Sequence, residues 1–154
     1  MRAAGKRPSV TACLAKEIGM ELEGGCLCGA VRYRIDAAEA VVDLCHCRMC
    51  RKAGGAPVVA WAQVPPAQFE VTRGAPKVYA SSKIASRHFC PDCGSQVYMS
   101  DPGGQSIGIT LGTLDDPEAL TPAAHGFDSE RIAWLHLEDG LPRYPEAPPY
   151  DEGG

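Results

Sequence analysis

The fold is decided by three short stretches of sequence: Gly25-Cys-Leu-Cys-Gly29, Cys45-His-Cys-Arg-Met-Cys50 and Cys90-Pro-Asp-Cys-Gly94. Together they hold seven of the eight cysteines in a chain of 154 residues. A thiolate is a strong ligand for zinc, which takes four ligands in structural sites and keeps one position open in catalytic sites. Seven thiolates therefore divide into a closed set of four and an open set of three, which predicts two Zn²⁺ sites.

The two glycine-flanked pairs, Cys26 with Cys28 and Cys90 with Cys93, are expected to form the closed, structural site. A turn carrying two cysteines places two sulfurs on one metal, and two such turns complete the tetrahedron. Joining them closes a loop of about 62 residues, at a cost of about 4 kcal/mol of chain entropy. Because a structural zinc site returns about 10–16 kcal/mol, the long connection is favourable.

The remaining trio, Cys45, Cys47 and Cys50, is expected to hold the second, catalytic zinc, with a fourth position open to water or substrate. His46 lies between two of these ligands, where a side chain usually points away from their metal. Three basic residues surround the trio as candidates to offset its charge or to hold an anionic substrate: Arg48, Arg51 and Lys52. Solvated charge on a short helical turn is the alternative for these three.

Iron–sulfur ligation and disulfide or redox chemistry are the alternatives to zinc. The common iron–sulfur spacings differ from these, and seven clustered cysteines would leave one without a disulfide partner. Residues 1–19 lack the continuous apolar segment of a secretory signal. A reducing, cytoplasmic location is therefore expected, and there clustered cysteines indicate metal binding or catalysis.

Composition predicts one mainly β domain. Seventeen glycines and thirteen prolines indicate many short segments separated by turns. The net charge of −4 argues against nucleic-acid binding, and no apolar run is long enough for a membrane span. Alternating or continuous apolar residues predict strands at residues 30–35, 58–64, 69–72, 77–80, 86–89, 96–99, 106–111 and 132–135. Helical turns are expected at 48–53 and at 117–120, the latter capped by Asp116.

Three regions follow along the chain. Residues 1–19 form an N-terminal extension of uncertain role, in which Cys13 is a bystander thiol and after which Met20 is a candidate biological start. Residues 20–144 form the zinc-binding domain. Residues 145–154 are Pro-, Gly- and acid-rich and are expected to form a flexible tail.

Three motifs resemble a known family. Gly24–Tyr33, Cys45–Gly54 and Arg87–Ser95 are similar to the motifs of the glutathione-dependent formaldehyde-activating enzyme (GFA) family, whose domain is shared with centromere protein V. The likeness extends to Gly112–Pro117 and Asp139–Tyr144, and so spans about residues 22–144.

This resemblance implies a tent-like β fold of short antiparallel strands and two zinc sites, divided among the cysteines as above. It also implies a carbon–sulfur lyase that reversibly joins glutathione, a small thiol, to formaldehyde, an aldehyde, as S-hydroxymethylglutathione. Bound zinc could stabilise the glutathione thiolate or polarise the formaldehyde carbonyl. Two alternatives stay open at this point: a non-catalytic, zinc-stapled binding module and a thiol or zinc redox sensor.

Overall fold

The computed structural model describes residues 19–149, and within them the chain is mainly β, as predicted. The strands are β1 (Glu21–Gly25), β2 (Arg32–Asp36), β3 (Val41–Cys45), β4 (Val59–Val64), β5 (Phe69–Arg73), β6 (Lys77–Ala80), β7 (Ser86–Phe89), β8 (Gln96–Ser100), β9 (Ile107–Thr110) and β10 (Ala124–Gly126). One helix, α1 (Arg48–Gly54), and four 3-10 turns, η1 (Pro66–Gln68), η2 (Leu111–Thr113), η3 (Pro117–Ala119) and η4 (Asp128–Glu130), complete the described chain. No helix in this part is long and apolar enough to cross a membrane.

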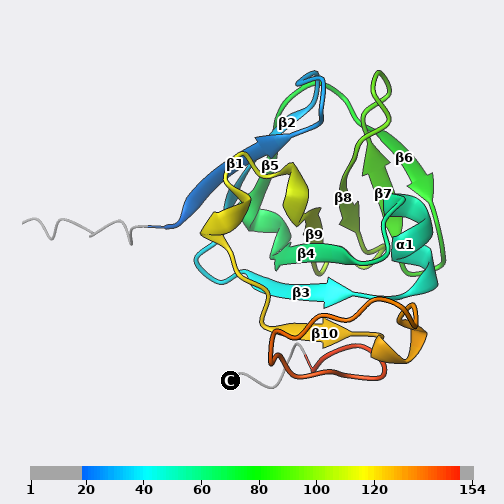
Figure 1. Ribbon diagram of the computed structural model, residues 1–154. Helices are drawn as coiled ribbons and strands as arrows, with labels where there is room; N and C mark the ends of the chain where they lie inside the picture. The colour runs from blue at the N-terminus through cyan, green and yellow to red at the C-terminus, as the bar shows by residue number, and fades with distance from the viewer. Residues whose placement is uncertain (1–18, 150–154) are drawn as a thin grey trace, which may run out of the picture.

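The strands form two sheets. A three-stranded sheet has the order β1-β2-β5, and a seven-stranded sheet has the order β10-β3-β4-β9-β8-β7-β6. All neighbours are antiparallel except β10, which pairs with β3 in parallel. In Figure 1 the small sheet slopes along one side, β6 to β8 stand on the other, and β3, β4 and β10 run across the bottom, which gives the tent-like outline.

The main core lies between the two sheets. Tyr33 and Ile35 on β2 are each 1% exposed and pack in one cluster with Val97 of β8 and Ile109 of β9. The period of two along β2 puts these two side chains on the inner face, and Arg32 and Arg34 on the outer face. A second, smaller cluster forms around Trp61 of β4 and contains two of the clustered cysteines. The candidate functional site is built on this second cluster.

Most predicted strands are present, but one is wrong. Residues 132–135 form a turn, in which the Leu135 amide donates to the Ile132 carbonyl at 3.0 Å and the Arg131 guanidinium donates to the Leu135 carbonyl at 2.6 Å. Trp134, the largest apolar residue of that pattern, is 68% exposed. Apolar residues in this segment therefore do not mark a buried strand face.

Three strands were not predicted: β1, β3 and β10. In β3 a buried Asp43 interrupts the apolar pattern, and β10 has only three residues. The predicted turn at 117–120 is present as η3, and the Asp116 carboxylate accepts from the Glu118 amide as its cap.

The two ends of the chain lie partly outside the described residues. Of the predicted N-terminal extension only Gly19 is described, so Cys13 falls outside. The described part of the predicted tail, residues 145–149, is bound to the domain. The Glu146 carbonyl accepts from the Phe127 amide at 2.8 Å, and Pro148 is buried next to Gly126.

A buried tyrosine joins the small sheet to the η2 turn. The Tyr33 hydroxyl lies 2.9 Å from the Thr113 hydroxyl, which donates to the Thr110 carbonyl at 2.7 Å, so Tyr33 is the donor in the first bond. Burial raises the pKa of Tyr33 to about 12. Gly24 is needed here because a Cβ at that position would collide with the Tyr33 hydroxyl and the Thr113 carbonyl.

Replacing Tyr33 by phenylalanine removes this single hydrogen bond while keeping the ring. We expect Tyr33→Phe to lower the free energy of unfolding by about 1 kcal/mol, measured by urea denaturation. Tyr79→Phe is the matched control, because Tyr79 is 64% exposed on the edge strand β6 and should leave stability unchanged. A Tyr33→Phe protein as stable as the parent would contradict this role.

Candidate metal centres

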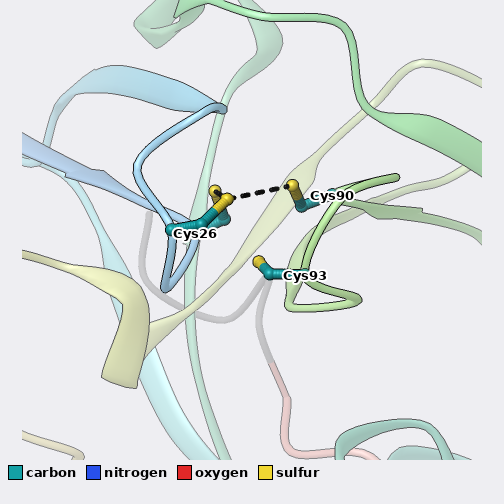
Figure 2. A group of neighbouring side chains, drawn as sticks. Cys26, Cys90 and Cys93 are labelled. Atoms are coloured by element: carbon teal, nitrogen blue, oxygen red, sulfur yellow. Dashed lines mark hydrogen bonds between the residues drawn. The ribbon is translucent and has the colours of Figure 1, made fainter.

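The first cysteine group joins two turns from different sheets. Cys26 and Cys28 lie in the β1–β2 turn, and Cys90 and Cys93 lie in the β7–β8 turn. Their four sulfurs lie within 4.8 Å of one another. Figure 2 shows the sulfurs of Cys26, Cys90 and Cys93 pointing toward one another across the gap between the two turns. The structure thus brings together the four residues expected at the closed site.

The sulfur separations fit a shared metal ion. The Cys26 and Cys28 sulfurs are 3.6 Å apart, and those of Cys28 and Cys90 are 3.8 Å apart. A disulfide would need about 2.05 Å. Tetrahedral zinc with Zn–S bonds of about 2.3 Å separates its ligand sulfurs by about 3.8 Å. This group could therefore hold a zinc ion with little movement of the backbone.

Both turns are built alike. A glycine follows the second cysteine of each pair in the left-handed region, Gly29 with φ 77° and Gly94 with φ 77°, a conformation that glycine adopts at no steric cost. Each glycine amide donates back to the carbonyl of the first cysteine, at 3.0 Å to Cys26 and 2.9 Å to Cys90. These bonds curl the chain so that both sulfurs of a pair face the same side.

Hydrogen bonds stabilise negative charge on two of the four sulfurs, those of Cys26 and Cys93. The Val31 amide donates to the Cys26 sulfur at 3.2 Å. The Ser95 hydroxyl lies 3.2 Å from the Cys93 sulfur and accepts from the Leu27 amide at 3.1 Å, so it also connects the two turns. Hydrogen bonding by Ser95 lowers the pKa of Cys93 to about 5. A thiolate is the ligand form of cysteine, so these contacts favour metal binding.

The second cysteine group surrounds the start of α1. Cys45 ends β3, Cys47 is the N-terminal cap of α1, and Cys50 lies within the helix and is buried. The three sulfurs lie within 4.8 Å of one another. The Cys47 sulfur accepts from the Cys50 amide at 3.3 Å. Hydrogen bonds from Cys45 and then Cys50 lower the pKa of Cys47 to about 2, so negative charge in the group settles on Cys47.

A buried arginine touches this trio. Arg87, from β7, is 5% exposed, and its Nη2 donates to the Cys50 sulfur at 3.7 Å. Its guanidinium carbon lies 5.9 Å from the centre of the Trp61 ring, a cation–π distance. A buried guanidinium needs a negative partner, and the trio supplies one. Arg87 was not predicted as part of the site. The available signal in the sequence was a single arginine within a short strand directly before Cys90.

A cavity of about 510 Å³ opens beside the trio. All three cysteines line it, together with Arg87, Trp61 and other residues of the seven-stranded sheet and the loops around it. This volume is in the range of small-molecule sites. A metal on the trio would have three sulfur ligands and would face a space large enough for a substrate.

The three basic residues predicted to surround the trio lie at different positions relative to the cavity. Arg48 is exposed and lines the cavity. Arg51 and Lys52 do not line it, and lie instead beside Trp134 at a separate shallow pocket. Arg51 donates from Nε to the His46 carbonyl at 3.0 Å and so fixes the backbone of the trio. Only Arg48 is therefore positioned to meet a substrate in the cavity.

His46 points away from the trio into a buried pair of histidines. His46 and His125 are both fully buried, and their Nε2 and Nδ1 atoms lie 2.8 Å apart. The Asp139 carboxylate accepts from His125 Nε2 at 2.8 Å, which leaves Nδ1 of a neutral His125 to accept from His46. Burial, and then His125, lower the pKa of His46, which keeps it neutral.

These histidines also form, with Asp128, a third group whose donor atoms lie within 4.8 Å of one another. The facing nitrogens of His46 and His125 are already used in their mutual hydrogen bond. A metal bound by these two facing nitrogens would need a lone pair on each, so this hydrogen bond and such a metal exclude each other. The pair is best understood as support for the backbone between Cys45 and Cys47.

Comparison with known proteins places this arrangement in a family. The family profile described as "Glutathione-dependent formaldehyde-activating enzyme" (GFA) matches residues 21–130, which contain both cysteine groups. The chain belongs to the GFA family. A Halomonas elongata protein named "Putative glutathione-dependent formaldehyde-activating enzyme" is 31% identical over 135 residues, which are 82% of this chain and 72% of that protein.

Two further proteins are similar to this GFA chain. A Schizosaccharomyces pombe protein named "Uncharacterized lyase" is 33% identical over 86 residues, which are 56% of this chain and 62% of that protein, so the match spans less than two thirds of its length. A crystal structure of a Rhodobacter sphaeroides protein has a TM-score of 0.52 and 24% identity, and covers 68% of this chain and 99% of that chain. This last likeness supports the fold alone.

The two cysteine groups of this GFA protein should respond differently to mutation. We expect Cys93→Ala to lose one zinc per chain and to lower the free energy of unfolding by more than about 5 kcal/mol, because it opens a site that joins two sheets. Cys47→Ala should also lose one zinc but keep the fold. Elemental analysis and urea denaturation measure the two effects. Equal destabilisation by both variants would contradict this division.

Proposed function

We propose that this protein is a zinc-dependent carbon–sulfur lyase that acts on a thiol–aldehyde adduct such as S-hydroxymethylglutathione. One observation carries the proposal: three thiolate donors face a substrate-sized cavity, with no fourth cysteine, histidine, aspartate or glutamate donor grouped with them among residues 19–149. The family match and the names of the two relatives support the same reaction class. The four-cysteine group is assigned to a structural zinc.

The reaction breaks the bond between sulfur and carbon in an adduct R–S–CH₂–OH. The electron pair of that bond goes to sulfur, the hydroxyl proton leaves, and the products are a thiolate and formaldehyde. Zinc held by Cys45, Cys47 and Cys50 would supply positive charge where the thiolate develops. In the reverse direction the thiolate attacks the aldehyde carbon and the alkoxide takes up a proton.

Residues around the trio supply the remaining functions. Arg87 donates to the Cys50 sulfur and so partly offsets the charge of three thiolates. Asp43 and Glu130 are the carboxylates of the cavity wall and can receive the hydroxyl proton. Arg48, exposed at the cavity, can pair with a carboxylate of glutathione. Trp61 and Phe127 reduce the access of water to the reacting atoms.

Catalysis is tested by exchange between glutathione, formaldehyde and their adduct, followed by nuclear magnetic resonance. We expect the zinc-loaded protein to accelerate exchange above the uncatalysed background, and a chelator that removes the less tightly held zinc to abolish the acceleration. Cys47→Ala should be inactive while folded. No acceleration by a protein carrying two zinc ions would disprove the proposal.

Arg48 is tested against a basic residue on the same helix. An exposed ion pair is worth up to about 1 kcal/mol, or about fivefold in affinity. We therefore expect Arg48→Ala to raise KM for glutathione about two- to fivefold, and to leave KM for 2-mercaptoethanol, which has no carboxylate, unchanged. Lys52→Ala is the matched control, since Lys52 does not line the cavity. An equal effect of Arg48→Ala on both thiols would exclude carboxylate recognition.

A further inference from the structure

The wall of the cavity is more apolar than S-hydroxymethylglutathione requires, since that adduct consists of a hydroxymethyl group and a peptide with two carboxylates. Beyond the cysteines and the charged groups, five of its ten other lining residues are large and apolar, namely Met49, Trp61, Ile84, Met99 and Phe127, and two are polar, Gln63 and Ser82. A hydroxymethyl group presents a single carbon to this wall. The proposed reaction therefore explains the presence of the trio. It provides no apolar group that would contact the large apolar side chains around the trio.

Two of these side chains are exposed at the cavity. Ile84, in the β6–β7 turn, is 78% exposed, and Met49, on α1, is 40% exposed. Large apolar side chains that gather around a concave site mark a surface that binds another molecule. They come from separate elements of the chain, so neighbours in sequence do not explain why they meet.

Phe127 adds an independent observation. It is the one non-glycine residue with positive φ among residues 19–149, at φ 54° and ψ 39°. This conformation costs an L-residue free energy, and such outliers cluster at functional sites. Hydrogen bonds on both sides hold it there: the Phe127 amide donates to the Glu146 carbonyl, and the Phe127 carbonyl accepts from the Glu130 amide at 2.9 Å. The chain thus maintains a strained backbone where an aromatic ring lines the cavity.

The charges of the wall do not favour a strongly anionic occupant. Two cations, Arg48 and Arg87, are matched by two carboxylates, Asp43 and Glu130. The Arg87 guanidinium already donates hydrogen bonds to Cys50 and Gln96. Glutathione carries two carboxylates, and Arg48 alone is exposed to receive one. The interior therefore fits an apolar group better than it fits the charged ends of a peptide thiol.

We propose that the adduct processed here carries an apolar substituent, about the size of a hexyl or phenylmethyl group, which lies against Trp61, Met99 and Phe127. This inference rests on the proposed lyase function and specifies its substrate class. The substituent could belong to the aldehyde or to the thiol, since both parts of the adduct lie next to the sulfur. Each buried methylene should raise kcat/KM up to about fourfold.

The test uses the zinc-loaded protein with two series of substrates. In the first, glutathione is kept and formaldehyde is replaced by acetaldehyde, hexanal and phenylacetaldehyde. In the second, formaldehyde is kept and 2-mercaptoethanol is replaced by hexanethiol and phenylmethanethiol. We expect kcat/KM, corrected for the uncatalysed rate, to rise at least about tenfold from the smallest to the largest member of one series. That series identifies which part of the adduct carries the substituent.

A pair of variants localises the effect. Ile84→Glu places a charge at the cavity, and Val78→Glu places the same charge on β6 at a residue that is 60% exposed and does not line the cavity. We expect Ile84→Glu to reduce the preference for apolar substrates at least fivefold, and Val78→Glu to keep it. Acceleration without any preference would overturn this inference and leave the lyase function standing. No acceleration in either series would overturn both.

Discussion

The fold depends on contact between two turns that belong to different sheets. Cys28 and Cys90 are 62 residues apart in sequence, yet their sulfurs are 3.8 Å apart. Seventeen glycines raise the entropy that the chain loses on folding, and aromatic residues make up only 6% of the chain. A metal ion held by the four sulfurs of this contact would contribute far more free energy than any single core side chain can. Such an ion would allow two short turns to hold the two sheets together.

Strand β7 links this contact to the second cysteine group. Arg87 on β7 touches Cys50, and the strand then runs directly into Cys90. A change in the position of the four-cysteine group would therefore move the guanidinium that offsets charge at the trio. The two groups have separate cysteines but share one strand, so a metal bound at the four-cysteine group would influence the geometry of the trio through β7.

The sequence predicted the parts of the molecule that follow local rules. Cysteine spacing predicted which sulfurs meet, and alternation predicted β2, although β1, beside it, was missed. Arg87, His125 and Asp139 were missed as parts of the site because their roles depend on contacts across 37, 79 and 14 residues. Strand β3 was missed because its buried Asp43 breaks the apolar pattern, and residues 132–135 were wrongly assigned because apolar residues in an exposed turn imitate a strand.

The backbone between Cys45 and Cys47 must be rigid, since a metal on the trio would receive only three ligands from the protein. His46 fixes this backbone through hydrogen bonds. Each of its polar groups forms one except the buried Nδ1, which has no hydrogen-bond partner among residues 19–149. Its amide donates to Gly126, its carbonyl accepts from Arg51, and its ring donates to His125. None of the three partner residues lines the cavity. These hydrogen bonds would hold the trio in place without a fourth protein ligand, and the side of the trio that faces the cavity would stay open to a substrate.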